Sequence, residues 1–230
     1  MNAIPLIITI DGPAGVGKTT LARKLADSLD IAYLDTGAMF RAVGLILERK
    51  GCGHDQEKIK TILAGISFGL EGSARQSSVT LNNSRLGPEI RTEEVGMLAS
   101  RAGQLEVVRD FLKETQQRIG GSTSLVAEGR DMGSVVFPGA RYKFFLDASP
   151  RIRAERRVSQ LESMGIKADY GLILAQMIKR DEQDRTRAIA PLRPAPDAYV
   201  IDTGKYCPDG VLEEIHRVLQ SGNKQPGANA

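Results

Sequence analysis

Short apolar runs alternate along this chain with longer segments of helical period. Five of these runs have the composition of core strands, at residues 4–10, 31–34, 124–127, 142–146 and 198–201. Helix-like sequence follows each of them, and such alternation is typical of an α/β fold with a parallel sheet flanked by helices. The last helix shows its period most clearly in the apolar positions Val211, Leu212, Ile215, Val218 and Leu219.

The region between about residues 63 and 91 breaks this alternation. Two short runs there, ISFGLE and SSVTLNN, have the length of antiparallel strands, with Gly and Asn turns around them and Pro88 after them. They predict a small antiparallel insert in place of another strand–helix unit. Residues 221–230 are polar and rich in Gly, which predicts a disordered tail.

Composition narrows the class of protein. A chain of 230 residues without a long linker fits one domain or two. Aromatic residues make up only 5% of it, which leaves little for stacking on nucleic acid, and the net charge of +3 is a weak basic bias. Cys52 and Cys207 form no C-x-x-C pair and suit a reducing cytoplasm. The apolar run after Met1 is too short for a membrane span and lacks the features of a signal peptide.

The first predicted strand ends in GPAGVGKT, residues 12–19, which matches G-x-x-x-x-G-K-[ST] with a strand before it and a helix after it. Glycines let main-chain N–H groups approach a phosphate chain, and the helix N-terminus adds partial positive charge. The alternative, a Gly-rich turn that binds no ligand, would not require the complete G-x-x-x-x-G-K-[ST] pattern. We therefore predict that the loop binds a nucleoside triphosphate, with Lys18 on the outer phosphates and the Thr19 hydroxyl on Mg²⁺.

The next two strand ends carry candidate residues for a second substrate. In YLDTGAMFRAVG, we expect Thr36 to cap a helix and to form an anion site with Arg41. In LVAEGRDMGS, a strand delivers Glu128, Arg130 and Asp131 at its carboxyl end, where open α/β sheets bind ligands. Glu128 could orient the water shell of Mg²⁺. A GTPase is not indicated, because N-K-x-D is absent.

Arginines gather in two later segments. PRIRAERR contains Arg151, Arg153, Arg156 and Arg157. Further on, KRDEQDRTRAIAP places Arg180, Asp184 and Arg187 on one predicted helical stripe. An exposed Arg–Asp stripe is most often a solvated set of ion pairs, but arginine also suits bidentate contact with phosphate and a transferring phosphoryl group. Beside a triphosphate site, this density predicts a helical lid over the phosphates.

Together, the P-loop, DTGAMFR, the insert, EGRDMGSVVFP, FFLDASPRIRAERR and RDEQDRTRAIAPL resemble bacterial-type cytidylate kinases of the nucleoside monophosphate kinase family, from about Ile7 to Ile201. The resemblance implies a P-loop NTPase fold in one kinase domain, residues 1–230. Its core would comprise 1–35, 101–149 and 168–220, its nucleoside monophosphate (NMP) binding region about 36–100 with the insert, and its lid about 150–167.

The resemblance also implies the reaction, transfer of the γ-phosphoryl of ATP to CMP or dCMP with Mg²⁺, by a cytoplasmic monomer without nucleic-acid or membrane partners. Implied ATP-binding residues are Gly12, Pro13, Ala14, Gly15, Val16, Gly17, Lys18, Thr19 and Thr20. Implied CMP-binding residues are Thr36, Arg41, Ser100, Arg109, Asp131, Arg180, Asp184 and Arg187. Implied catalytic residues are Lys18, Arg130, Asp131, Arg157, Arg180 and Arg187, with Thr19 and Glu128 on the metal.

The chemistry of cytosine supports part of this set independently. Its hydrogen-bonding edge has one amino donor and two acceptors, which match one carboxylate and one arginine. Asp131 and Arg109 provide these two groups. Thr19, Thr36 and Glu128 depart from the commoner family residues. The alternatives are a kinase for another monophosphate or for an alcohol such as shikimate, which would need a base, and a non-catalytic ATP-dependent binding module.

Overall fold

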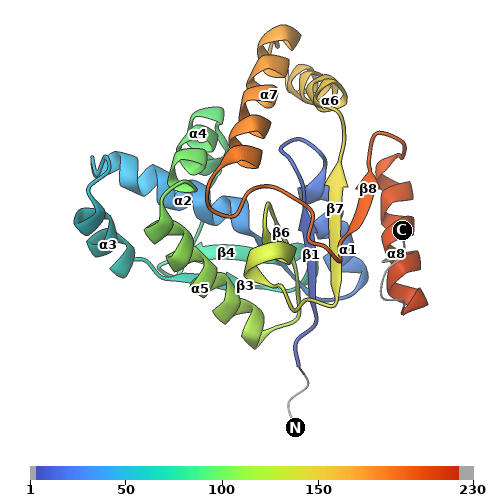
Figure 1. Cartoon of the computed structure of the whole chain (residues 1–230), viewed down its shortest axis with the longest axis horizontal. Coiled ribbons are helices and arrows are strands. Elements are labelled where there is room, and N and C mark those ends of the chain that lie inside the picture. The colour runs from blue at the N-terminus through green and yellow to red at the C-terminus, as the bar shows by residue number, and fades with distance from the viewer. Residues whose placement is uncertain (1–3, 223–230) are drawn as a thin grey trace. The chain divides into compact units, whose positions relative to one another are not determined.

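A computed structural model describes residues 4–222 of the chain (Figure 1). These residues form two compact units. The first unit contains Ala26–Gly129 and the residues before Ile8, and the second contains Ile8–Leu25 and the residues from Arg130 onward. The main sheet has five strands, whose pairings within each unit are parallel. The α/β class predicted from the sequence is therefore confirmed.

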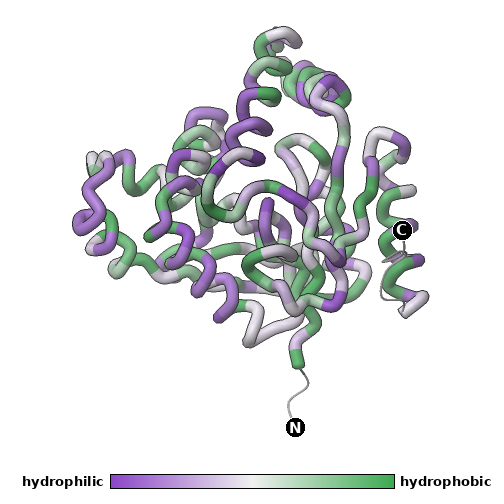
Figure 2. The backbone as a smooth tube through the Cα atoms, viewed as in Figure 1, coloured by the Kyte–Doolittle hydropathy of each residue, from purple (hydrophilic) through white to green (hydrophobic). Residues whose placement is uncertain are grey.

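In the second unit, β1 (Ile7–Asp11), β7 (Tyr142–Asp147) and β8 (Tyr199–Asp202) pair in that order. The apolar side chains of β7 are buried, as are Ile8 and Ile10 of β1 and Ile201 of β8, and Figure 2 shows β1 and β7 as largely hydrophobic. The helices are α1 (Lys18–Ser28), α6 (Pro150–Ser163), α7 (Tyr170–Thr186) and α8 (Pro208–Ser221), and a π-helical turn spans Met132–Val136. Of these, α6 and α7 pack against each other.

In the first unit, β2 (Ala32–Asp35) pairs with β6 (Leu125–Gly129). The helices are α2 (Thr36–Arg49), α3 (Gln56–Ala64), α4 (Glu93–Ala102) and α5 (Glu106–Ser122). The insert is an antiparallel sheet of β3 (Phe68–Glu71), β4 (Ser78–Leu81) and β5 (Ser84–Arg85), with 3₁₀ turns at Ala74–Gln76 and Pro88–Arg91.

All five predicted core strands and both predicted strands of the insert are present. The first strand begins at Ile7 rather than at residue 4, because Pro5 has no N–H to donate and Ile4 is 94% exposed. The periodic positions of α8 are also confirmed, with Val211, Ile215 and Val218 buried.

Ser221, expected to begin the tail, is the last residue of α8, and residues 223–230 of the predicted disordered tail lie outside the described residues. Within 4–222, no helix has the length and apolar character needed to cross a membrane. The division into core, NMP-binding region and lid stays a prediction.

Candidate functional site

The predicted phosphate loop joins β1 to α1 in the second unit, and its three glycines serve different needs. A methyl group added at Gly12 (φ +146°) would lie 2.2 Å from the carbonyl oxygen of Leu146, and one at Gly15 (φ +77°) 3.2 Å from Cε of Met177. At Gly17 (φ +98°) no atom lies within 4 Å of that position. Two glycines thus permit close packing, and all three have positive φ, which disfavours other residues.

Lys18 begins α1 and folds back over the loop that precedes it. Its side chain is buried, and Nζ donates hydrogen bonds to the carbonyl oxygens of Gly12 at 2.8 Å and Pro13 at 2.7 Å. Thr19 and Thr20 follow in the first helical turn and are exposed. Main-chain N–H groups of a first turn lack intrahelical acceptors, so this end of α1 is suited to an anion.

Asp11 ties the end of β1 to the turn that follows Asp131. Its two carboxylate oxygens accept hydrogen bonds from the main-chain N–H groups of Met132 and Gly133, each at 2.8 Å. Burial raises the pKa of Asp11 to about 7; the two N–H donors oppose this rise, Asp131 adds to it and Lys18 opposes it. A buried carboxylate therefore holds the strand before the phosphate loop against the segment that carries Asp131.

Alternating charges form a cluster beside this turn. Nε of Arg130 donates to Oδ2 of Asp184 at 3.0 Å, and Nη2 of Arg187 lies 3.8 Å from Oδ1 of the buried Asp131. Burial would raise the pKa of Asp184, but Arg130 and then Arg180 and Arg187 outweigh it and lower the pKa below its usual value. The structure thus brings five of the predicted site residues together within the second unit.

The predicted stripe on α7 holds for Arg180 and Asp184 but is wrong for Arg187. The helix ends at Thr186, and Arg187 leaves it with φ −60° and ψ 140°. The chain then folds back, so that the Leu192 N–H donates to the carbonyl oxygen of Asp184 at 2.7 Å. Figure 2 shows the C-terminal half of α7 as mainly hydrophilic, although Asp184 itself is buried.

The four arginines of α6 differ in their burial and in their hydrogen-bond partners. Arg156 donates to Thr203, at 3.1 Å to Oγ1 and 2.7 Å to the carbonyl oxygen, and Nη1 of Arg157 donates to Gln160 at 2.8 Å. Arg151 is exposed, whereas Arg153 is buried within the protein. Arg153 and Arg156 are thus engaged by acceptors of the protein itself. The predicted lid over the phosphates stays a prediction.

A hollow of about 130 Å³ lies next to the phosphate loop in the second unit. Its walls come from the loop, from α1 and from the segment that joins β8 to α8. The lining residues include Val16, Thr20, Leu21, Lys24, Arg156, Tyr206 and Val211. Apolar walls with a few polar groups at the rim are typical of sites for small organic ligands.

In the first unit, Asp35 rather than Thr36 caps α2. Oδ1 of Asp35 accepts from the Ala38 N–H at 2.9 Å, and Thr36 is the first helical residue. The predicted cap at Thr36 is wrong because the helix already begins at Thr36, directly after Asp35, which ends β2 and is itself a good cap. Thr36 is buried, and its hydroxyl donates to the Glu128 carbonyl oxygen at 2.6 Å.

Glu128 lies at the end of β6 and is also buried. Its Oε1 accepts a hydrogen bond from the hydroxyl of Tyr33 on β2. The described residues contain no group of three or more His, Cys, Asp or Glu side chains arranged to hold a metal ion. A metal role of Glu128 stays a prediction.

Arg41 projects from α2 onto α4. Its Nη1 donates to the carbonyl oxygens of Ile90 and Thr92, both at 3.0 Å. A methyl group added at Gly96 would lie 3.3 Å from Nη2, so the absence of a side chain at Gly96 makes room for this guanidinium. The close packing of the two helices therefore fixes where the Arg41 charge lies.

Arg109 and Ser100 lie on α5 and α4 of the same unit. Arg109 is buried, donates to the Gly103 carbonyl oxygen at 3.3 Å, and lies with its guanidinium carbon 5.7 Å from the centre of the Phe40 ring. Ser100 is half-buried. Their predicted contact with a base is not tested by this geometry.

Comparison with known proteins identifies the relatives of this chain. The family model for cytidylate kinase matches residues 8–221, which include the phosphate loop and all of the predicted site residues. The chain belongs to the cytidylate kinase family. A relative named cytidylate kinase from Nitratidesulfovibrio vulgaris is 55% identical, with 94% of this chain and 93% of the relative covered. Another, from Oleidesulfovibrio alaskensis, is 54% identical over 94% of this chain and 98% of its own length.

Sequence reasoning about this cytidylate kinase family member missed two buried charged residues. Asp11 was not singled out, although a carboxylate at the end of an apolar strand was a usable signal. Arg153 was grouped with the lid arginines, and nothing local in PRIRAERR distinguishes it from its neighbours. The structure shows that both side chains hold the segments that carry predicted site residues.

Proposed function

We propose that this chain transfers the γ-phosphoryl group of ATP to CMP or dCMP, giving ADP and CDP or dCDP in pyrimidine nucleotide metabolism. The observation that carries the proposal is the match to cytidylate kinases over residues 8–221. The buried charge cluster around Asp131 adds support, because a binding module without an acceptor substrate has no evident use for it.

On the donor side, the main-chain N–H groups of the phosphate loop would bind the phosphates of ATP, and the N-terminus of α1 would favour their charge. Lys18 would exchange its carbonyl partners for phosphate oxygens, which requires only rotation of a flexible side chain. The hollow beside Val16 and Tyr206 would receive the base of the donor, since it adjoins the loop and has apolar walls.

On the acceptor side, Thr36 and Arg41 would bind the phosphate of CMP, and Ser100, Arg109 and Asp131 would read the cytosine edge. Asp184 would accept a hydrogen bond from the ribose. Its lowered pKa supports this role, because the carboxylate stays ionised and remains an acceptor at neutral pH. Arg180 and Arg187 would serve the acceptor phosphate and the group in transfer.

In the transfer step, an oxygen of the acceptor phosphate attacks the γ-phosphorus in line. A new P–O bond forms while the bond to the β-phosphate oxygen breaks, and that oxygen leaves on ADP with the bonding electrons. The attacking oxygen is already ionised, so no general base is required. Lys18, Arg130, Arg157, Arg180 and Arg187 would neutralise the charge of the transferring group, which is the main source of catalysis in phosphoryl transfer.

Mg²⁺ is proposed as the cofactor. The Thr19 hydroxyl is exposed in the first turn of α1, beside the proposed phosphate site, and the carboxylate of Glu128 would act through water. These oxygen donors fit Mg²⁺, which prefers oxygen ligands and keeps several waters. When bound, the ion supplies charge neutralisation and orients the phosphates. We also propose a cytoplasmic monomer, and the two free thiols, Cys52 and Cys207, support a reducing compartment.

An ADP-release assay with a panel of acceptors tests the proposal. CMP and dCMP should release ADP at rates well above those with AMP, GMP or shikimate. Equal release with shikimate would favour an alcohol kinase, and slow ATP loss that is independent of any acceptor would favour a binding module. Either result would refute the proposed function.

A further inference from the structure

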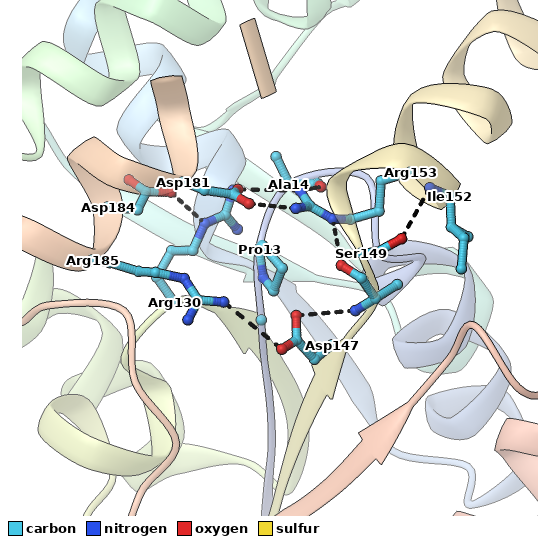
Figure 3. Close-up of polar contacts among 12 residues, drawn as sticks. Pro13, Ala14, Arg130, Asp147, Ser149, Ile152, Arg153, Asp181, Asp184 and Arg185 are labelled. Carbon is cyan, nitrogen blue, oxygen red and sulfur yellow. Dashed lines mark hydrogen bonds and ion pairs between the residues drawn. The ribbon is translucent and has the colours of Figure 1, made fainter. Parts of the chain in front are cut away.

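Arg153, near the start of α6, has none of the roles assigned so far. It is 1% exposed and is among the largest fully buried side chains of the described residues. Its Nε donates to the carbonyl oxygen of Ala148 at 2.9 Å, and its Nη1 to that of Ala14 at 2.9 Å (Figure 3). Ala14 lies in the phosphate loop, so a side chain of α6 directly contacts the loop's main chain.

The same guanidinium makes a two-pronged contact with Asp181 of α7. Nη1 lies 3.1 Å from Oδ1, and Nη2 donates to Oδ2. A planar guanidinium is suited to this geometry, which a lysine cannot reproduce. Asp181 directly follows Arg180 and precedes Asp184 by one helical turn, and Figure 3 shows both aspartates on the same stretch of α7. One side chain therefore joins the phosphate loop, the start of α6 and the part of α7 that carries site residues.

The contact with Ala14 determines the direction of the next main-chain donor. The peptide bonds of the described residues are all trans, so the carbonyl oxygen of Ala14 and the N–H of Gly15 point in opposite directions. Holding the oxygen on Arg153 directs the Gly15 N–H away from α6. A methyl group at Gly15 would lie 3.5 Å from Cβ of Arg153 and 3.2 Å from Cε of Met177, so α6 and α7 both pack against this part of the loop.

We propose that Arg153 is a positioning residue for phosphoryl transfer. It orients the peptide between Ala14 and Gly15 so that the Gly15 N–H can bind a donor phosphate, and through Asp181 it couples the loop to α7. Arg153 acts through these neighbours and contacts no nucleotide. The inference rests on the proposed function, because it assumes that the loop binds ATP.

A purely structural role would be to hold α6 against α7, and a paired substitution separates the two roles. Arg153→Met alone would leave a buried, unpaired carboxylate and destabilise the fold. Arg153→Met combined with Asp181→Leu removes both charges, and such replacements of buried ion pairs often preserve stability. The double variant should therefore melt near the wild-type temperature but still lack the hydrogen bond to Ala14.

The decisive readout is the dissociation constant for ATP with Mg²⁺, measured calorimetrically without an acceptor. We expect it to rise by roughly 10-fold or more in the double variant, the size expected for a charge-assisted hydrogen bond. The ¹⁵N–¹H resonance of Gly15 should also shift, because the peptide between Ala14 and Gly15 is no longer held by Arg153. Arg217→Met is the matched control, since Arg217 is a 73% exposed arginine paired with Glu214 on one helix.

A double variant that melts like the wild type and binds ATP with the wild-type dissociation constant would overturn the proposal. If the double variant does not fold, Arg153→Lys decides the matter with the same readouts, because it keeps a positive charge opposite Asp181 but not the fork geometry. Failure of the proposed function would look different. The wild-type protein would then transfer no phosphoryl group from ATP to CMP, although its affinity for ATP would still depend on Arg153.

Discussion

The two units hold their proposed site residues by different physical means. In the second unit, buried charges do so: Asp11 binds two main-chain N–H groups, and Arg153 joins Ala14 to Asp181. In the first unit, the close approach of α2 and α4 holds Arg41, although Arg109 and Glu128 are also buried there. A methyl group at Gly44 of α2 would lie 2.7 Å from the carbonyl carbon of Leu98 in α4, and one at Gly96 of α4 would touch Arg41 of α2.

This contrast indicates which substitutions each unit tolerates. Removing a charge while keeping the volume should impair the second unit, because a buried partner then loses its counterpart. Adding volume while keeping the charge should impair the first unit, because packed helices have no space for another methyl group. Four substitutions test the contrast, from the largest expected effect to the smallest.

Lys18→Met removes the charge from the phosphate loop and keeps most of the apolar stem. Turnover should fall by roughly 10³-fold or more, the scale found for other cations that act on a transferring phosphoryl group. The fold should stay intact but the melting temperature should fall, because the buried carbonyl oxygens of Gly12 and Pro13 lose their donor. Steady-state kinetics with CMP measures the effect, and near-normal turnover would refute the role given to Lys18.

Asp11→Asn should change how stability depends on pH. The pKa of Asp11 is raised from 3.8 to about 7 in the folded protein, so the folded state binds this proton more tightly than the unfolded chain. The contribution of Asp11 to the free energy of unfolding is therefore greatest below about pH 4. It is lost as the pH rises toward 7, by roughly 4 kcal/mol in all.

Urea unfolding at several pH values between 5 and 8 measures this effect. The free energy of unfolding of the wild type, minus that of Asp11→Asn, should decrease by roughly 3 kcal/mol across this range, because asparagine does not titrate. A difference that stays constant with pH would show that Asp11 is ionised throughout and that its burial has no such cost.

Asp131→Asn tests the reading of the base. It keeps the volume of a buried side chain but removes its charge and one acceptor, so recognition of cytosine should weaken by about 1–3 kcal/mol, or roughly 10- to 200-fold in kcat/KM. The measurement compares CMP with UMP as acceptors. An equal loss of kcat/KM for the two would mean that Asp131 does not read the base.

Gly96→Ala adds one methyl group beside Arg41 in the first unit. The guanidinium would need to move by a few tenths of an ångström, so KM for CMP should rise by roughly threefold, while KM for ATP should not change. Gly121→Ala is a matched control, because a methyl group at Gly121 meets no atom within 4 Å. An unchanged KM for CMP would show that Arg41 does not bind the acceptor phosphate.

Much of the fold could be predicted because its signals are local. Strand β7, for example, is an apolar run followed by a helix that begins with Ser149 and Pro150, and both ends are visible in the sequence. Strand β5 was missed because its two residues, Ser84 and Arg85, are exposed and show no apolar alternation. The insert around it was still recognised from its turns and from the two longer strands.

The site divides in the same way. The phosphate loop is one contiguous motif, so its residues could be assigned before the structure was known. Asp11 and Met132 are 121 positions apart, and Arg153 and Ala14 are 139 apart, and no local pattern encodes such pairs. Arg187 illustrates a third case: helical spacing placed it on one stripe with Arg180 and Asp184, but the helix ends at Thr186 and Arg187 lies beyond it.

The most direct test of the central claim is to identify the products formed from ATP and CMP by the purified chain. The account predicts equimolar ADP and CDP, with CDP formed by Lys18→Met at roughly a thousandth of the wild-type rate or less. ADP that accumulates without CDP, or no ADP above the rate without an acceptor, would contradict the claim that this site transfers a phosphoryl group to cytidylate.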